Sequence, residues 1–152
     1  MRLLLLNKID DIAEWQSALP FEASLFAQHG ALAHVVAVKE QSVAARCSLW
    51  ISPVKYQAKR IGAVGHFAAR EEKAANRVLN EACRWLLQQG CELVVGPMDG
   101  NTWRNYRFVV EHGEQPPFFL EPQNLTCYPR YFTDADFRPI ANYSSILCDD
   151  LT

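Results

Sequence analysis

The stretch GHFAAREEKAANRVLNEA, residues 65–82, joins a short apolar strand to the most regular helix pattern of the chain. Apolar side chains recur along one helix face at Ala75, Val78, Leu79, Ala82 and Leu86. Gly90 then ends the helix. The turn before the helix, Arg70–Asn76, contains no glycine, although turns that hold phosphate groups usually do. The sequence therefore leaves two interpretations of this turn, an anion-binding site or a plain helix start.

Strand-like runs lie on both sides of this helix. IGAVGHFAA, residues 61–69, precedes it, and CELVVGP, residues 91–97, follows it. Because a strand–helix–strand order within one sheet is nearly always a right-handed crossover, these two strands are predicted to be parallel. Upstream, residues 32–40 and 42–52 are strand-like and separated by a polar turn near Glu40–Ser42, which predicts a hairpin.

Further elements are predicted toward both ends of the chain. Residues 2–7 are apolar enough for a first strand, and residues 12–19 and 22–30 have helical patterns. A short helix is predicted to start near Pro129. Residues 138–148 then predict a final strand or strand pair.

The bulk composition limits the classes of function. The chain has 152 residues, of which 49% are hydrophobic and 21% charged, so one mixed α/β (α+β) domain over residues 1–152 is expected. A net charge of −2 gives no support for nucleic-acid binding. No apolar run is long enough for a membrane span, and the N-terminal leucine run is too short for a signal peptide. A cytoplasmic protein is therefore expected.

The cysteines and histidines do not show the spacing of a metal site. The five cysteines are scattered, without a Cys-x-x-Cys pair, at Cys47, Cys83, Cys91, Cys127 and Cys148. Such usage predicts reduced, buried thiols. No metal is expected.

The turn and the order of elements resemble the GNAT superfamily of acyl-CoA-dependent N-acyltransferases. In that superfamily the turn that binds the CoA diphosphate reads Arg/Gln-x-x-Gly-x-Gly/Ala, followed by two aliphatic residues. Arg70 and Ala75 match the ends of this pattern, and Val78 and Leu79 match the aliphatic pair. Lys73 stands where the pattern has its middle glycine.

The resemblance covers about residues 33–145 and continues after the turn. The segments GPMDGNTWRNYRF, PPFFLEP and YPRYFTDADF resemble a GNAT-like subgroup with Gly-Pro after the strand, then a double proline, then a tyrosine-rich turn. Asp136 replaces the glycine that this subgroup has before the phenylalanine at Phe137. The resemblance implies a GNAT-type fold, with a twisted central sheet splayed between residues 61–69 and 91–96.

The same resemblance implies acetyl-CoA or another acyl-CoA as co-substrate, a small-molecule amine as acceptor, and no metal. The pantetheine arm of CoA would lie along the strand before the turn, and the diphosphate would lie at the helix N-terminus. The residues implied in binding CoA are Ala63, Val64, Gly65, Phe67, Arg70, Lys73, Ala74, Ala75 and Asn76.

Catalytic roles are also implied. The leaving thiolate needs an acid, often a tyrosine in these enzymes, and Tyr128 and Tyr131 are the nearest candidates. In the usual arrangement the tyrosine lies five residues before the phenylalanine, a position that Phe132 holds here. His66 is the candidate base. For each of these residues, packing in the core is the alternative role.

The aromatic segment after residue 97 leaves alternatives open. Trp103, Tyr106 and Phe118 are candidates to line the acceptor pocket, or they pack in the core. The departures from the family pattern also allow a non-catalytic GNAT-like domain that binds a ligand or a protein. In a third interpretation, the segment around Trp103–Phe119 packs on a partner or forms a homodimer.

Overall fold

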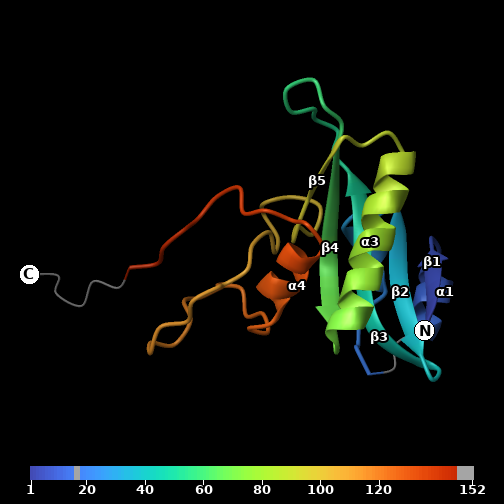
Figure 1. Cartoon of the computed structure of the whole chain (residues 1–152), viewed down its shortest axis with the longest axis horizontal. Helices are drawn as coiled ribbons and strands as arrows, with labels where there is room; N and C mark the ends of the chain where they lie inside the picture. The colour runs from blue at the N-terminus through green and yellow to red at the C-terminus, as the bar shows by residue number, and fades with distance from the viewer. Residues whose placement is uncertain (16–17, 147–152) are drawn as a thin grey trace, which may run out of the picture.

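The computed structural model describes residues 1–15 and 18–146 (Figure 1). The elements in chain order are β1 (Arg2–Leu6), α1 (Ile9–Glu14), α2 (Ser24–Gln28), β2 (Ala33–Lys39), β3 (Ser42–Ile51), β4 (Ile61–Ala69), α3 (Glu72–Gln88), β5 (Leu93–Val95) and α4 (Tyr128–Asp134). The strands form one sheet in the order β1-β2-β3-β4-β5. β1 to β4 are antiparallel neighbours, whereas β4 and β5 are parallel. The predicted α+β class is confirmed.

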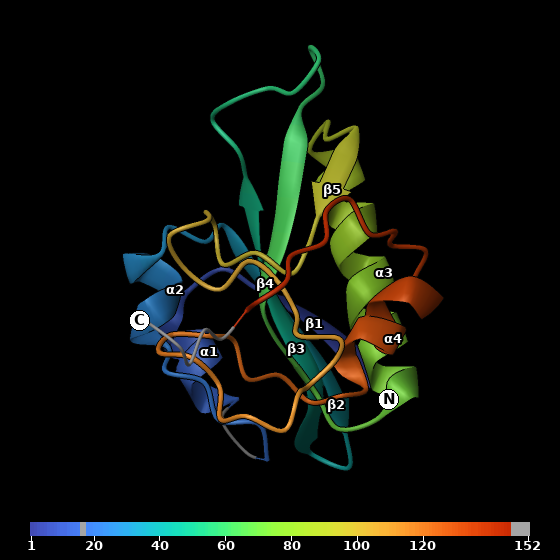
Figure 2. The same ribbon diagram turned by 90° about the vertical axis from the view of Figure 1, so that its left-hand side faces the viewer.

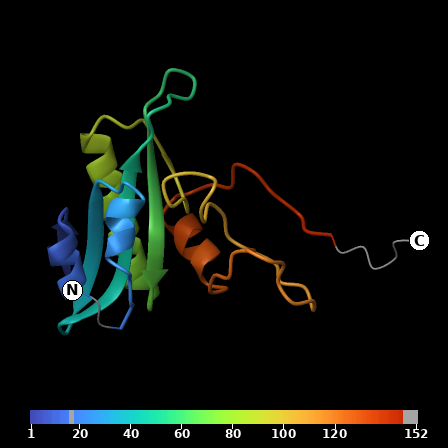
Figure 3. The same cartoon turned by 180° about the vertical axis from the view of Figure 1, so that it is seen from behind.

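Two helical layers cover the sheet. α1 and α2 lie on one face and α3 and α4 on the other, as Figure 2 and the rear view in Figure 3 show. The predicted apolar stripe of α3 is fully buried, because Val78, Leu79, Ala82 and Leu86 pack against the sheet. The α1–α2 face has its own core, with Ile12 among its buried residues.

The central predictions are confirmed. β2 and β3 form the expected hairpin, and its two turn residues, Glu40 and Gln41, have φ angles of 48° and 63°. Positive φ at both central residues is the backbone of the two-residue turn that matches strand twist. β4, α3 and β5 form the predicted parallel crossover, although β5 pairs with β4 only from Ile61 to Ala63.

Two predictions are wrong. The helix predicted over residues 12–19 ends at Glu14, and Ala18 has a φ of 62°, which no right-handed helix allows. The predicted final strand is absent from residues 138–146, the part of it that the structure describes. A strand needs a partner, and β5 is three residues long. Ile140 and Ile146 are consequently 87% and 86% exposed.

Residues 96–127, all of which the structure describes, contain neither helix nor strand. They run beside the β4–β5 side of the sheet and lead into α4. The described residues after α4 first pass β5 and then extend away from the sheet (Figure 1). Among the described residues, no helix has the length and apolar character of a membrane span.

Candidate functional site

A β-bulge in β4 sets the geometry of the site. Ser48 pairs with Gly65 and Arg46 with Ala68, so two residues of β4 oppose one residue of β3. One of the two is His66, whose φ of 46° lies in the left-handed region. The bulge turns the His66 ring toward the α1–α2 face, where it meets rings from that layer.

The bulge carries a chain of polar side chains. Nδ1 of His66 lies 2.9 Å from Oγ of Ser48, and that oxygen lies 2.7 Å from Nδ1 of His34. On its other side, Nε2 of His66 lies 2.8 Å from Nδ1 of His29. His29 follows α2 and is partly exposed, whereas Ser48 and His34 are fully buried. The chain therefore leads from the surface into the sheet.

The three imidazoles in this row of hydrogen-bonded side chains are neutral at neutral pH. Burial lowers the pKa of His34 and of His66 to about 3, and the Arg46 guanidinium contributes in the same direction. Burial and the nearby Arg104 also lower the pKa of His29. Moving a charged imidazolium out of water costs more free energy than moving a neutral imidazole, so burial disfavours the charged forms.

Arg46 holds the bulge against the segment before α2. Its guanidinium donates to the backbone carbonyl of His66, to that of Pro20 at 2.9 Å and to that of Leu19 at 3.4 Å. It also lies over the ring of Phe21, 4.8 Å from the centroid. The charge is thus satisfied by backbone oxygens, as buried charges require.

Asp99 caps the bulge from the segment after β5. Its carboxylate accepts a 2.6 Å hydrogen bond from the backbone N–H of His66. Asp99 is 8% exposed, and burial raises the pKa of its carboxyl group. The Asp99 carbonyl in turn accepts from Arg104 at 3.2 Å, which anchors the segment.

The same segment covers part of the β4 edge beyond β5. The N–H of Met98 donates to the carbonyl of Val64 at 2.8 Å. A Cβ at Gly65 would lie 2.2 Å from the Met98 carbonyl oxygen, so only glycine fits there. The β4 edge is therefore covered as far as His66, and Phe67–Ala69 lies beyond this cover.

α4 reaches that remaining stretch. The Tyr128 hydroxyl accepts the Ala69 N–H at 3.1 Å and donates to the Ala69 carbonyl at 3.4 Å. The Phe67 ring packs on Tyr128 and on Phe132, each with ring centroids 5.0 Å apart. Tyr131 is buried beside Cys127. A hydrogen bond with the Cys127 side chain and burial both raise the pKa of Tyr131.

The turn that follows β4 begins α3 without a side-chain cap. The first backbone hydrogen bond of the helix runs from Ala75 N–H to the carbonyl of Glu71, so the three preceding N–H groups have no partner within the helix. Arg70 and Lys73 are exposed, and neither makes an ion pair with a residue that the structure describes. This end of α3 thus combines free N–H groups with two unpaired cations.

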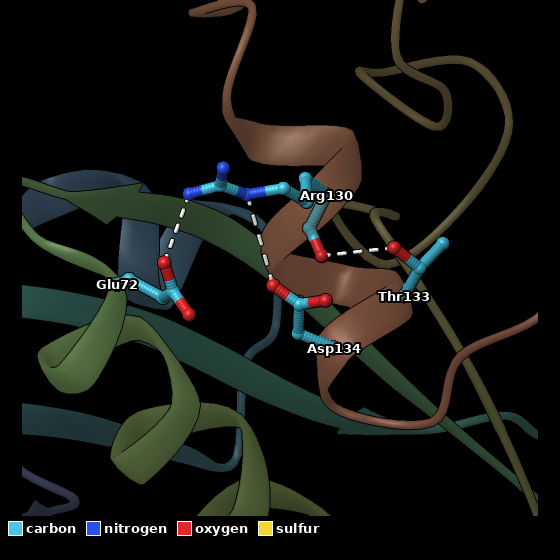
Figure 4. A network of polar contacts seen from close by, with 4 residues as sticks. All are labelled: Glu72, Arg130, Thr133 and Asp134. Atoms are coloured by element: carbon cyan, nitrogen blue, oxygen red, sulfur yellow. Dashed lines mark hydrogen bonds and ion pairs between the residues drawn. The ribbon is translucent and has the colours of Figure 1, made fainter.

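The two glutamates of the turn form ion pairs with residues of neighbouring elements. Glu71 forms an ion pair of 3.0 Å with Lys39 of β2. Glu72 forms one of 2.9 Å with Arg130 of α4, which also lies 3.8 Å from Asp134 (Figure 4). Each acid therefore has a cation beside it that reduces its repulsion of an anion at the turn.

An open groove lies between α3, β5 and the end of α4. Its volume is about 520 Å³, and Asn80, Gly96 and Phe137 line it. One helix turn before Asn80, the buried Oδ1 of Asn76 has no hydrogen-bond partner among the described residues. The groove lies on the α3–α4 side and does not include His66.

The residues predicted for the acceptor pocket do not come together. Trp103 is 95% exposed and Phe118 is 44% exposed. Tyr106 packs on Tyr143, with ring centroids 6.2 Å apart. Among the described residues, no hydrogen bond or ring contact joins any two of the three predicted side chains.

Sequence reasoning missed Asp99, Ser48, Arg46 and the pairing of His29 with His66. A signal was present, because serine and arginine interrupt the otherwise apolar run of β3, and an acid follows Gly-Pro after β5. Polar residues at buried strand positions indicate hydrogen-bonded networks. Among the described residues, no group of three or more His, Cys, Asp or Glu could hold a metal ion.

Solved structures share this architecture. An aminoglycoside N-acetyltransferase, AAC(6′)-Iy in complex with CoA, is 11% identical over 98% of this chain and 95% of its own, with a TM-score of 0.61. An aminoglycoside acetyltransferase from an uncultured soil metagenomic sample, in complex with trehalose, is 10% identical over 99% and 95%, with a TM-score of 0.53. A transcriptional regulator from Bacillus halodurans C-125 is 10% identical over 97% and 100%, with a TM-score of 0.56.

At these identities the likeness shows the fold alone. No protein-family model and no curated protein matches the sequence. The GNAT-type fold expected from the sequence is confirmed. The fold does not fix the activity, because acetyltransferases and a transcriptional regulator share it.

Proposed function

We propose that the protein is an acyl-CoA-dependent N-acyltransferase that transfers an acetyl or related acyl group to a small-molecule amine. One observation carries the proposal: β4 leads from a polar network at its bulge directly into an uncapped helix N-terminus with unpaired cations. The first feature suits proton transfer, and the second suits a diphosphate. A GNAT-type fold raises the prior for this combination.

The diphosphate of CoA fits the turn before α3. The free N–H groups of residues 72–74 and the helix dipole favour an anion there. Arg70 and Lys73 add two cations, and Ala74 is small enough to let an anion approach the backbone. Both glutamates already have cationic partners. We therefore keep the turn residues, including Ala75 and Asn76, as the proposed diphosphate site.

The pantetheine arm has less of β4 available than the sequence suggests. Ala63 pairs with β5, and Val64 and Gly65 contact Met98. In our proposal the arm therefore hydrogen-bonds along Phe67–Ala69, next to the turn. It competes there with the Tyr128 hydroxyl for the Ala69 backbone.

Acyl-CoA supplies the thioester that the amine attacks. The protein supplies groups that take a proton from the amine and give one to the leaving thiolate. A proton leaves the amine toward the polar network that contains His66. Burial lowers the pKa of His66 to about 3, so this ring is a weak base, and the more exposed end of the network is the better acceptor. Tyr128 is the better placed of the two tyrosines to protonate the leaving thiolate, because its hydroxyl lies at the Ala69 backbone, on the stretch of β4 proposed for the arm, whereas Tyr131 hydrogen-bonds to Cys127.

Isothermal titration with acetyl-CoA and with CoA tests the proposal. Both should bind with micromolar to submillimolar affinity, and Lys73→Glu should weaken both about tenfold by reversing a charge at the turn. Lys55→Glu is the matched control, because Lys55 is exposed in the loop before β4, at the opposite end of that strand from the turn. If neither ligand binds at millimolar concentration, the proposal is wrong.

A second candidate is a non-catalytic GNAT-like domain that binds CoA or another ligand. The observation in its favour is that Asp99 and Tyr128 already occupy backbone groups of β4. CoA binding without transfer to any of a broad panel of amines would support it. Turnover that Tyr128→Phe abolishes would exclude it.

A further inference from the structure

The chain His29–His66–Ser48–His34 is unbranched, and each of its three contacts is short. The contacts measure 2.8, 2.9 and 2.7 Å in that order. Each contact holds one proton between two heavy atoms, so a proton on one side excludes a proton on the other. The ring nitrogen of His29 outside the chain, Nε2, makes no hydrogen bond to a described residue.

Proton counting leaves two arrangements for the neutral chain. A neutral imidazole has one N–H, and serine has one O–H on an oxygen that can accept two hydrogen bonds. If both rings donated to Ser48, its buried O–H would have no acceptor, because among the described residues only His66 and His34 lie within hydrogen-bond distance of its Oγ. In the first, His29 donates through Nδ1 to His66, His66 donates through Nδ1 to Ser48, and Ser48 donates to His34. In the second, all three hydrogen bonds run the opposite way, and His29 carries its proton on Nε2. The tautomers of the three rings are thus linked.

A proton on His29 selects the first arrangement. An imidazolium has N–H on both nitrogens, so Nδ1 of His29 must then donate and Nε2 of His66 must accept. His66 consequently carries its proton on Nδ1, Ser48 donates to His34, and the His34 proton lies on Nε2. In the neutral first arrangement, Nε2 of His29 is the unprotonated nitrogen, ready to accept that proton.

The charged groups around the chain keep the positive charge on His29. Arg46 of β3 lowers the pKa of both His34 and His66, and these two rings are the more buried ones. Arg104, from the segment after β5, donates to the His29 carbonyl at 3.2 Å and lowers the His29 pKa. Asp99 acts on His29 in the opposite direction. His29 is partly exposed, so its cation keeps contact with water.

We propose that His29 is the proton acceptor for the amine, and that His66, Ser48 and His34 are positioning residues that hold it in the accepting tautomer. This inference rests on the proposed acyl transfer. As the amine nitrogen bonds to the acyl carbon, the C–S bond breaks and an amine proton moves to Nε2 of His29. His29 then releases that proton to solvent, and the thiolate is protonated by Tyr128 or water, which gives an amide and a free CoA thiol.

Imidazole nitrogen NMR of the intact protein, labelled with ¹⁵N-histidine, tests the linkage without any substrate. The protein has four histidines in all, so the spectrum is simple. On acidification through the His29 titration, His66 should carry its proton on Nδ1 and His34 on Nε2. In Ser48→Ala the His34 tautomer should no longer follow His29. Ser42→Ala, on the same strand and outside the chain, should behave as the parent.

Two results would overturn the linkage: an Nδ1–H on His34 while His29 is doubly protonated, or an unchanged linkage in folded Ser48→Ala. Kinetics then test the catalytic role. His29→Gln should lower kcat about 10²–10⁴-fold with little change in the KM for acyl-CoA, and His112→Gln, at an exposed histidine, should not. An unchanged kcat in His29→Gln would overturn the role of His29.

The experiments can disprove the proposed function and the tautomer linkage independently of each other. If CoA does not bind but the tautomers are linked, the proposed function is wrong and the linkage stands, without a role in acyl transfer. If CoA binds and acyl transfer occurs while the tautomers are independent, the proposed function stands and the positioning role is wrong.

Discussion

The carboxylate of Asp99 accepts the backbone N–H of His66, 33 positions earlier in the chain, at 2.6 Å. This contact ties the segment after β5 to the bulge of β4. A charged acceptor for a buried N–H makes a strong hydrogen bond, and an N–H left without a partner in the interior is costly.

Asp99→Ala should therefore lower the free energy of unfolding by about 1–3 kcal/mol. Asp99→Asn should cost less, because an amide oxygen can still accept the same N–H. Urea denaturation measures both. Asp134→Ala is the control at an exposed, weakly paired acid, and it should stay within about 0.5 kcal/mol of the parent. Equal losses for the alanine and asparagine variants of Asp99 would contradict this account.

The buried histidines predict acid sensitivity. The folded-state pKa of His34 and of His66, about 3, lies below the 6.5 of an exposed histidine, which is expected in the unfolded chain. As pH falls below 6.5, the unfolded chain takes up protons that the folded chain does not, so stability present above pH 6.5 is lost toward pH 3. By pH 5 each histidine should account for about 2 kcal/mol of loss.

Unfolding free energies from urea titrations at several pH values between 5 and 7 measure this slope. His34→Asn, which can keep a hydrogen bond to Ser48, should lower the slope by the share of one proton, because the proton that the unfolded chain takes up at His34 is removed while those at His66 and His29 remain. His112→Asn, at an exposed histidine, should leave it unchanged. A flat profile for the parent protein would contradict the neutral, buried state of these rings.

The Glu72–Arg130 ion pair predicts a gain of CoA affinity on neutralisation. Glu72→Gln removes a negative charge from the turn and frees Arg130 to face an incoming diphosphate. We expect CoA to bind about three- to tenfold more tightly, measured by titration calorimetry at low salt. Glu81→Gln breaks a comparable Glu–Arg pair further along α3 and should have no effect. Weaker binding in Glu72→Gln would place the diphosphate elsewhere.

Replacing Gly65 even by alanine should cause a large loss of stability. A Cβ there would lie 2.2 Å from the Met98 carbonyl oxygen and 2.5 Å from Oδ1 of Asp99, and the backbone atom cannot move without separating the segment from β4. Gly65→Ala should therefore cost about 2 kcal/mol or more in thermal or chemical unfolding. Gly113→Ala, where a Cβ meets no atom within 4 Å, should be neutral or slightly stabilising. Similar effects of the two substitutions would contradict the close approach.

Much of the fold was predictable because its signals are local. The stripe from Ala75 to Leu86 follows the helix period, so α3 could be located from the sequence alone. Likewise, the polar turn at Glu40–Gln41 lies between two strand-like apolar runs, which predicts the β2–β3 hairpin. β4 has the same bounds in the structure as in the sequence prediction.

The errors arise where tertiary context decides. Residues 138–146 have the composition of a strand, but no strand of the described part of the chain pairs with them, so propensity alone misleads. Trp15 packs onto the β1–β2 region with Leu19 instead of continuing α1. Helix patterns of eight residues are short enough for such packing to override them.

The site was predictable only in part. The turn at Arg70–Asn76 could be found because its residues align with the GNAT pattern, and His66 because it lies in the strand just before the turn. The hydrogen bond between Asp99 and His66, and the contact of His29 with His66, join residues far apart in the chain. A single sequence contains the residue types of such a network but not their pairing.

The bulge in β4 makes the length of this strand, and not only its composition, a condition for the site. His66 faces the polar network of the α1–α2 layer, while its neighbour Phe67 faces the aromatic rings of α4. Deleting one residue between Gly65 and Ala69 would remove the bulge and turn the side chains after the deletion to the opposite face of the sheet. Grafting this site onto another protein would therefore require transferring the irregular strand as one unit, together with Asp99 and Tyr128, which cap it.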